Sequence, residues 1–157
     1  MNTEGKQKHS TLFVVLSWVA VFVMALVIFW MSAHTDEGIN HGLGIISEIK
    51  AILASIGASI FGHQVDVSPV GHFTEFFIFG LVLFNALRLH LGANRIITLV
   101  VAVAIASLYG ASDEIHQIFV PGRSCDIADW AVDTIAAFLG AGLMFLILKA
   151  RRKASRK

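Results

Sequence analysis

Four long apolar runs constrain this 157-residue chain more than any other feature of its sequence. The runs cover residues 12–31, 70–87, 96–111 and 127–148. A bilayer core about 30 Å thick is crossed by about 20 helical residues, and the runs are close to that length. They also lack the alternation of apolar and polar residues that is typical of barrel strands. The sequence therefore predicts an all-α fold, a polytopic membrane helical bundle of four spans.

The composition supports a membrane protein and excludes several other classes. Hydrophobic residues make up 56% of the chain and charged residues 15%, against about 45–50% and about 25% in soluble domains. Intrinsic disorder is excluded, because disordered chains contain few large apolar residues. The single cysteine, Cys125, excludes an internal disulfide framework and a multi-cysteine metal site. The formal charge of +1 gives no indication of nucleic-acid binding.

The basic residues predict how the spans are oriented. Residues 1–11, 88–95 and 149–157 carry 2, 2 and 6 Lys or Arg residues, whereas the other two connections carry only Lys50 and Arg123. Short cytoplasmic segments carry an excess of Lys and Arg. We therefore expect the N-terminal tail (1–11) and the basic tail (149–157) to lie in the cytoplasm, flanking a membrane domain at 12–148.

The long connection between the first and second spans carries a further helical pattern. Within residues 39–61, apolar side chains recur every three or four positions. The segment is short and contains Glu48 and Lys50, so a fifth span is not expected. We expect an amphipathic helix in the outer interface, or alternatively a helix packed on the bundle.

Ionisable residues inside the spans indicate the functional region, because such a residue at the bilayer centre costs about 2.5–3.5 kcal/mol. His72 and Glu75 lie about 4–9 Å inside the outer end of the second span at about 1.5 Å per residue. Asp129 and Asp133 lie about 4–10 Å inside the fourth span by the same rise. The outer end of the third span carries Asp113, Glu114 and His116. We expect the helix faces that carry these residues to turn away from lipid and toward one another.

Some of these residues also have a structural interpretation. Asp126 and Asp129 suit the N-cap and first turn of a helix, whereas Asp133 lies too deep to cap. Arg123 follows Pro121-Gly122, a dipeptide suited to a tight turn. It could pair with a nearby carboxylate or bind an anionic head group. The remaining structural alternatives are loop charges, for Asp113 and Glu114, and an interhelical polar pair, for His72 and Glu75.

The residues of this region resemble a known family. The sequence reads HFTEF at 72–76 and DEIHQIFVPGRS at 113–124, followed by Asp126, Asp129, Asp133, Gly140 and Gly142. This is similar to the VanZ-like family of small bacterial membrane proteins, whose pattern combines H-x-x-E-F, E-x-x-Q-x-F-x-P-G-R and D-x-x-x-N-x-x-G elements. The resemblance covers residues 10–150. Asp133 stands where the family often has asparagine.

The resemblance implies a multi-pass protein of the bacterial plasma membrane, and the founding members are linked with low-level resistance to the glycopeptide teicoplanin. We therefore expect an outward-facing polar site that binds or handles a membrane lipid or a lipid-linked envelope precursor. The candidate ligand-binding residues are His72, Asp113, Gln117, Arg123, Asp126 and Asp129.

A small intramembrane enzyme acting on a lipid-linked envelope substrate is the alternative. Carboxyl groups and imidazoles perform general acid–base catalysis. The candidate catalytic residues are Glu75, Glu114, His116 and Asp133, with His72 as a further proton acceptor. Alternatively, a divalent metal such as zinc or manganese could be held by mixed ligands, namely His72, Glu75, His116 and Asp129. No compact metal motif is present in the sequence, so whether the protein binds a metal cofactor stays an open question.

Two further interpretations concern transport and assembly. Intramembrane acids often mark ion pathways, but the inner halves of the spans carry few polar residues apart from Ser17 and Asn85. A monomeric transporter is therefore not expected. Small residues such as Ala102 with Ala106, and Ala136 with Gly140, permit close helix packing within one chain or in a homo-oligomer.

Overall fold

The computed structural model describes residues 10–34, 68–91 and 95–155, together with the isolated residues 48, 51–52, 55, 58–59 and 62. The chain forms four long helices, α1 (Thr11–Ser32), α4 (Ser68–Leu91), α5 (Arg95–Gln117) and α6 (Ile127–Ala154). All four are long and apolar enough to cross a membrane, and the described residues contain no strand. The predicted all-α bundle of four spans is confirmed.

The helix ends follow local sequence signals. Asp126 precedes α6, and its side chain accepts a hydrogen bond of 2.8 Å from the backbone N–H of Ala128, as expected for an N-cap. Ser10 caps α1 in the same way. After α5, the backbone N–H of Arg123 donates to the carbonyl of Val120, and Gly122 has a φ of 83°. Pro121-Gly122 therefore forms the tight turn that its sequence predicts.

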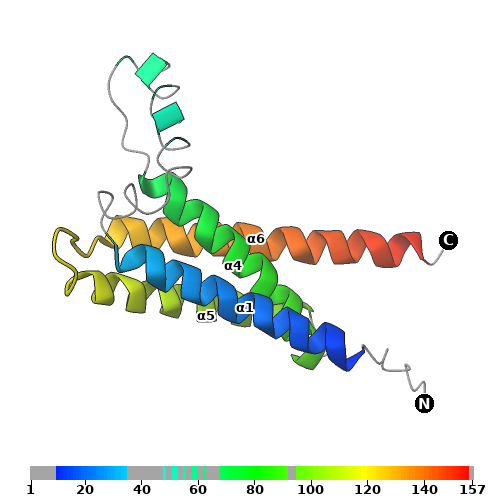
Figure 1. Ribbon diagram of the computed structural model, residues 1–157. Coiled ribbons are helices and arrows are strands. Elements are labelled where there is room, and N and C mark those ends of the chain that lie inside the picture. The colour runs from blue at the N-terminus through cyan, green and yellow to red at the C-terminus, as the bar shows by residue number, and fades with distance from the viewer. Residues whose placement is uncertain are drawn as a thin grey trace.

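Helix α4 holds the bundle together, because it packs against each of the other three helices and most extensively against α6. Figure 1 shows α4 crossing obliquely over α6, with α1 and α5 beside them. Helices α1 and α5 finish at the end of the bundle where α4 and α6 begin. We call this the polar end. The opposite end, which carries Arg88, Arg95, Arg151 and Arg152, is the basic end.

Two glycines allow α4 and α6 to approach at backbone distance. A Cβ atom built on Gly80 would overlap the carbonyl oxygen of Ala137, and one built on Gly140 would overlap that of Phe77. The surrounding small residues of α6, including Ala136 and Ala137, are fully buried. Ala136 and Gly140, which the sequence indicates for close helix packing, therefore pack within the chain.

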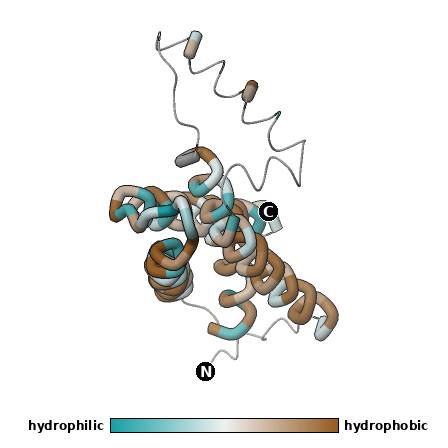
Figure 2. Tube along the Cα trace, turned by 60° about the vertical axis from the view of Figure 1, so that its left-hand side comes forward, coloured by the Kyte–Doolittle hydropathy of each residue, from teal (hydrophilic) through white to brown (hydrophobic). Residues whose placement is uncertain are grey.

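The outer surface of the bundle is largely apolar. On α1 alone, Leu12, Leu16 and Phe22 are more than half exposed. Figure 2 shows apolar residues predominating along the helices. An exposed apolar surface of this extent suits contact with lipid chains rather than water.

The amphipathic segment expected at 39–61 lies mostly outside the described residues. The structure describes only six residues of it, all helical: Glu48, Ala51, Ile52, Ser55, Ala58 and Ser59. Its apolar stripe stays a prediction.

Substitution of Gly140 by alanine is expected to destabilise the bundle. The new methyl group must push α4 away from α6, and overpacking of this kind costs about 1–3 kcal/mol. The matched control is Gly142→Ala on the same helix, where a Cβ would meet no atom within 4 Å. Thermal unfolding in detergent should show a lower midpoint for Gly140→Ala alone. Equal midpoints for the two variants would contradict the close contact.

Candidate functional site

The polar end contains a cluster of buried polar side chains from three helices. Asp113, Glu114 and Gln117 of α5 are buried, as is Asp133 of α6. The side chain of His72, on α4, is 12% exposed. The convergence of α4, α5 and α6 that the depth of these residues predicts is therefore present in the fold.

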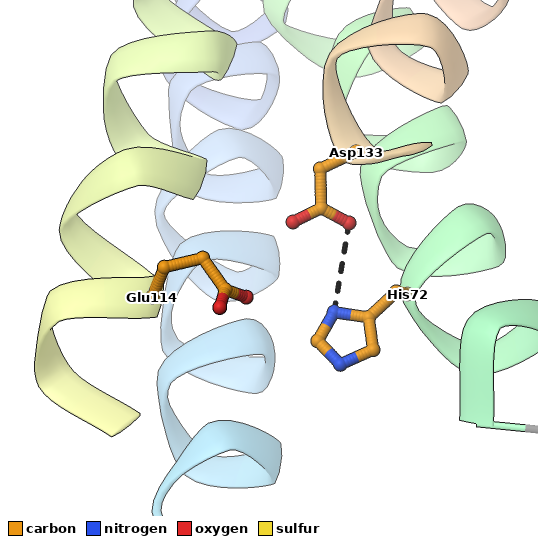
Figure 3. Close-up of side chains that lie close together, drawn as sticks. All are labelled: His72, Glu114 and Asp133. Carbon is orange, nitrogen blue, oxygen red and sulfur yellow. Dashed lines mark ion pairs between the residues drawn. The ribbon is translucent and has the colours of Figure 1, made fainter. Parts of the chain in front are cut away.

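His72, Glu114 and Asp133 form the centre of this cluster. Nδ1 of His72 lies 3.5 Å from Oδ1 of Asp133, and one potential ligand atom from each of the three residues lies within 4.8 Å of the others. Figure 3 shows the three side chains pointing toward one another from three different helices. We call these residues the His72–Glu114–Asp133 group.

Asp133 is the most deeply buried member of the group. Its side chain is 0% exposed, and neither carboxylate oxygen accepts a hydrogen bond from any described residue. Among the described residues Nδ1 of His72 likewise has no hydrogen-bond partner, and its 3.5 Å contact with Asp133 is an ion pair when the imidazole is protonated. A buried carboxylate is costly unless it is paired or protonated. The group can therefore hold a cation or exchange protons.

Glu114 links the end of α5 to the start of α6. Its Oε2 accepts a hydrogen bond of 2.7 Å from the backbone N–H of Asp126, and its Oε1 accepts one of 3.3 Å from Nε2 of Gln117. Gln117 also donates to Oδ2 of Asp113, at 3.2 Å. These contacts fix the orientation of the Glu114 carboxylate relative to His72 and Asp133.

The other candidate residues lie around this centre. His116 turns toward α1, where its ring centroid lies 4.7 Å from that of Phe29. Glu75 and Asp129 are partly buried, and Asp126 is exposed and caps α6. Of the metal-ligand set considered from the sequence, only His72 belongs to the group whose donor atoms converge.

Arg123, in the connection between α5 and α6, forms hydrogen bonds with the C-terminal end of α1. Its guanidinium donates from Nη2 to the carbonyl oxygens of Met31, at 3.3 Å, and His34, at 2.8 Å. The last carbonyls of a helix have no partner within the helix and carry its negative dipole end, so a cation there is favourable. The Nε atom of Arg123 is buried and has no hydrogen-bond partner among the described residues.

Sequence reasoning did not identify Gly110 as part of the site. A Cβ on Gly110 would lie 3.3 Å from the ring of Phe76 and 3.5 Å from Oδ2 of Asp133. A side chain here would press on the Phe76 ring and lie in van der Waals contact with the Asp133 carboxylate. A signal was available, because Ala102, Ala106, Gly110 and Glu114 are spaced by four residues and share one face of α5.

Fold and site together define a four-span membrane protein with a buried histidine–carboxylate group at one end. A family model for VanZ/LLP1 matches residues 12–148, so the chain belongs to the VanZ/LLP1 family, as the resemblance in its motifs indicates. No curated protein and no solved structure matches the chain.

Replacement of Arg123 by glutamine is expected to loosen the end of α1. Two carbonyls lose a charged donor, and a hydrogen bond to a charged group is worth about 1.5–3 kcal/mol. Arg151→Gln, an exposed position at the basic end, is the matched control. Thermal unfolding in detergent should give a lower midpoint only for Arg123→Gln. Two equally stable variants would show that these hydrogen bonds contribute nothing.

Proposed function

We propose that this VanZ/LLP1-family protein resides in the bacterial plasma membrane and binds the head group of an envelope lipid or a lipid-linked cell-wall component at its polar end. The observation that carries the proposal is the convergence of buried polar residues from α4, α5 and α6 at one end of an apolar bundle. Membrane-spanning helices begin and end near the head groups, so a site there is within reach of a lipid head group.

The charge distribution supports an orientation with the polar end outside the cell. Arg88, Arg95, Arg151 and Arg152 belong to the basic end, and cytoplasmic ends of spans carry the excess of basic residues. Both chain termini are then cytoplasmic. The polar end would face the compartment in which cell-wall precursors and glycopeptides meet.

Arg123 supports an anionic ligand. Its Nη2 atom donates to the carbonyls of Met31, in α1, and His34, just beyond α1, whereas its buried Nε lacks a partner among the described residues. An Arg N–H is a strong donor to a phosphate or carboxylate oxygen. The guanidinium is already positioned by α1, so little side-chain entropy is lost on binding.

An enzyme is the second candidate, favoured by the His72–Asp133 pair. A carboxylate that faces Nδ1 of a histidine orients the imidazole and leaves its Nε2 to take up a proton. Glu114 lies close enough to act on the same ligand. The substrate of such an enzyme would be the same lipid-linked component.

The test is the teicoplanin susceptibility of a sensitive host that expresses the wild type, Glu114→Gln or Glu48→Gln at matched membrane levels. Glu48→Gln makes the same chemical change at an exposed residue outside the cluster. We expect the wild type and Glu48→Gln to protect, and Glu114→Gln to lose protection, because its neutral amide cannot replace the buried carboxylate.

Two results would count against the proposal. Equal susceptibility of the wild-type strain and the empty host would remove the link to glycopeptides. Full protection by Glu114→Gln would show that the polar cluster is not the functional site. A graded loss in Arg123→Lys beside a complete loss in Glu114→Gln would favour catalysis over binding alone.

A further inference from the structure

The His72–Glu114–Asp133 group presents one nitrogen and two carboxylates to a single small volume. Each residue comes from a different helix, and the three side chains point into the space between α4, α5 and α6 (Figure 3). Donors that converge from separate elements do not arise from local capping or from pairing along one helix. Helix capping and pairing along one helix therefore do not explain why these three side chains converge.

Asp133 supplies an independent observation. It is completely buried, it points into the group, and both of its oxygens lack a hydrogen-bond donor among the described residues. Buried polar atoms in proteins are almost always satisfied, and each exception needs an explanation such as a catalytic role, a water or an ion. The described residues offer Asp133 a positive charge if His72, 3.5 Å away, is protonated, and a cation bound in the space that Asp133 faces is the alternative.

The distances suit a metal ion. Two ligands bonded to a tetrahedral ion at about 2.0–2.1 Å lie about 3.3 Å apart. Nδ1 of His72 and Oδ1 of Asp133 are 3.5 Å apart, already near that spacing. One carboxylate oxygen of Glu114 completes a set of three donor atoms that all lie within 4.8 Å of one another.

The balance of charge also favours a divalent ion. A protonated His72 would supply one positive charge against the two carboxylates of Glu114 and Asp133. A divalent ion supplies two charges and takes a neutral imidazole as its ligand. The carboxylate of Glu114 accepts hydrogen bonds from the amide of Gln117 and the backbone N–H of Asp126. Carboxylates that bind metals are usually held in place by hydrogen bonds of this kind.

We propose that His72, Glu114 and Asp133 bind one divalent transition-metal ion of the kind that accepts mixed imidazole and carboxylate ligands, zinc or manganese. The inference does not rest on the proposed lipid function, because it follows from these three residues alone. If both hold, the ion lies at the polar end and offers an open position to an anionic head group.

The experiment measures metal binding to the full-length protein, purified in detergent with its affinity tag removed and its metal stripped by a chelator. Zinc and manganese are added separately, free ions are removed, and bound metal is measured by elemental mass spectrometry. We expect about one ion per chain for the wild type. His72→Gln, Glu114→Gln and Asp133→Asn each change a proposed ligand and should retain little or no metal.

Two controls are matched to these variants. Glu48→Gln and His90→Gln make the same changes at exposed residues outside the group. Both should bind metal like the wild type. Size-exclusion chromatography identifies any variant that has not folded, and the remaining variants then decide the result.

The proposal is overturned if the wild type retains neither metal, which would leave His72 and Asp133 as a simple ion pair. It is also overturned if folded variants of the group bind as tightly as the controls, which would place the metal elsewhere. Metal binding by a protein that gives no teicoplanin protection would support the metal site and count against the proposed function alone.

Discussion

The backbone contact between α4 and α6 is the constraint on which the site depends. Gly80 and Gly140 let the two helices touch where any side chain would separate them. Asp133 lies one turn before Ala137, the residue against which Gly80 packs, so the crossing fixes how closely Asp133 approaches α4. Gly110 brings α5 close to both helices, because a Cβ there would lie 3.3 Å from the Phe76 ring and 3.5 Å from the Asp133 carboxylate.

A carboxylate at this position changes what the site requires. An asparagine at this position would offer an amide oxygen without bringing a charge into the bundle. Asp133 brings a negative charge beside Glu114 in a buried place, where an unpaired charge costs far more than in water. That cost can be offset by a proton, by the His72 imidazolium or by a bound cation.

The sequence predicts the fold better than it predicts the detail of the site. The four spans follow from apolar length, and the depth of the polar residues predicts that the polar faces of α4, α5 and α6 meet. Depth alone does not predict that Glu114 and Asp133, rather than Glu75 and Asp129, converge with His72. The carbonyl partners of Arg123 could not be predicted, because no local pattern relates residue 123 to the end of α1. His116 shares a helical face with Asp113 by spacing, yet packing against Phe29 turns its ring toward α1.

The two ends of the bundle carry separate polar networks. Toward the basic end, Arg88 donates to Asn85, which donates to Ser17 on α1. Between this network and the His72–Glu114–Asp133 group, the described core of α4 is apolar, with Phe76, Phe79, Leu83 and Phe84 almost fully buried. This apolar stretch of α4 separates the two networks, so among the described residues the buried acids lie on one side of it and the Arg88–Asn85–Ser17 contacts on the other.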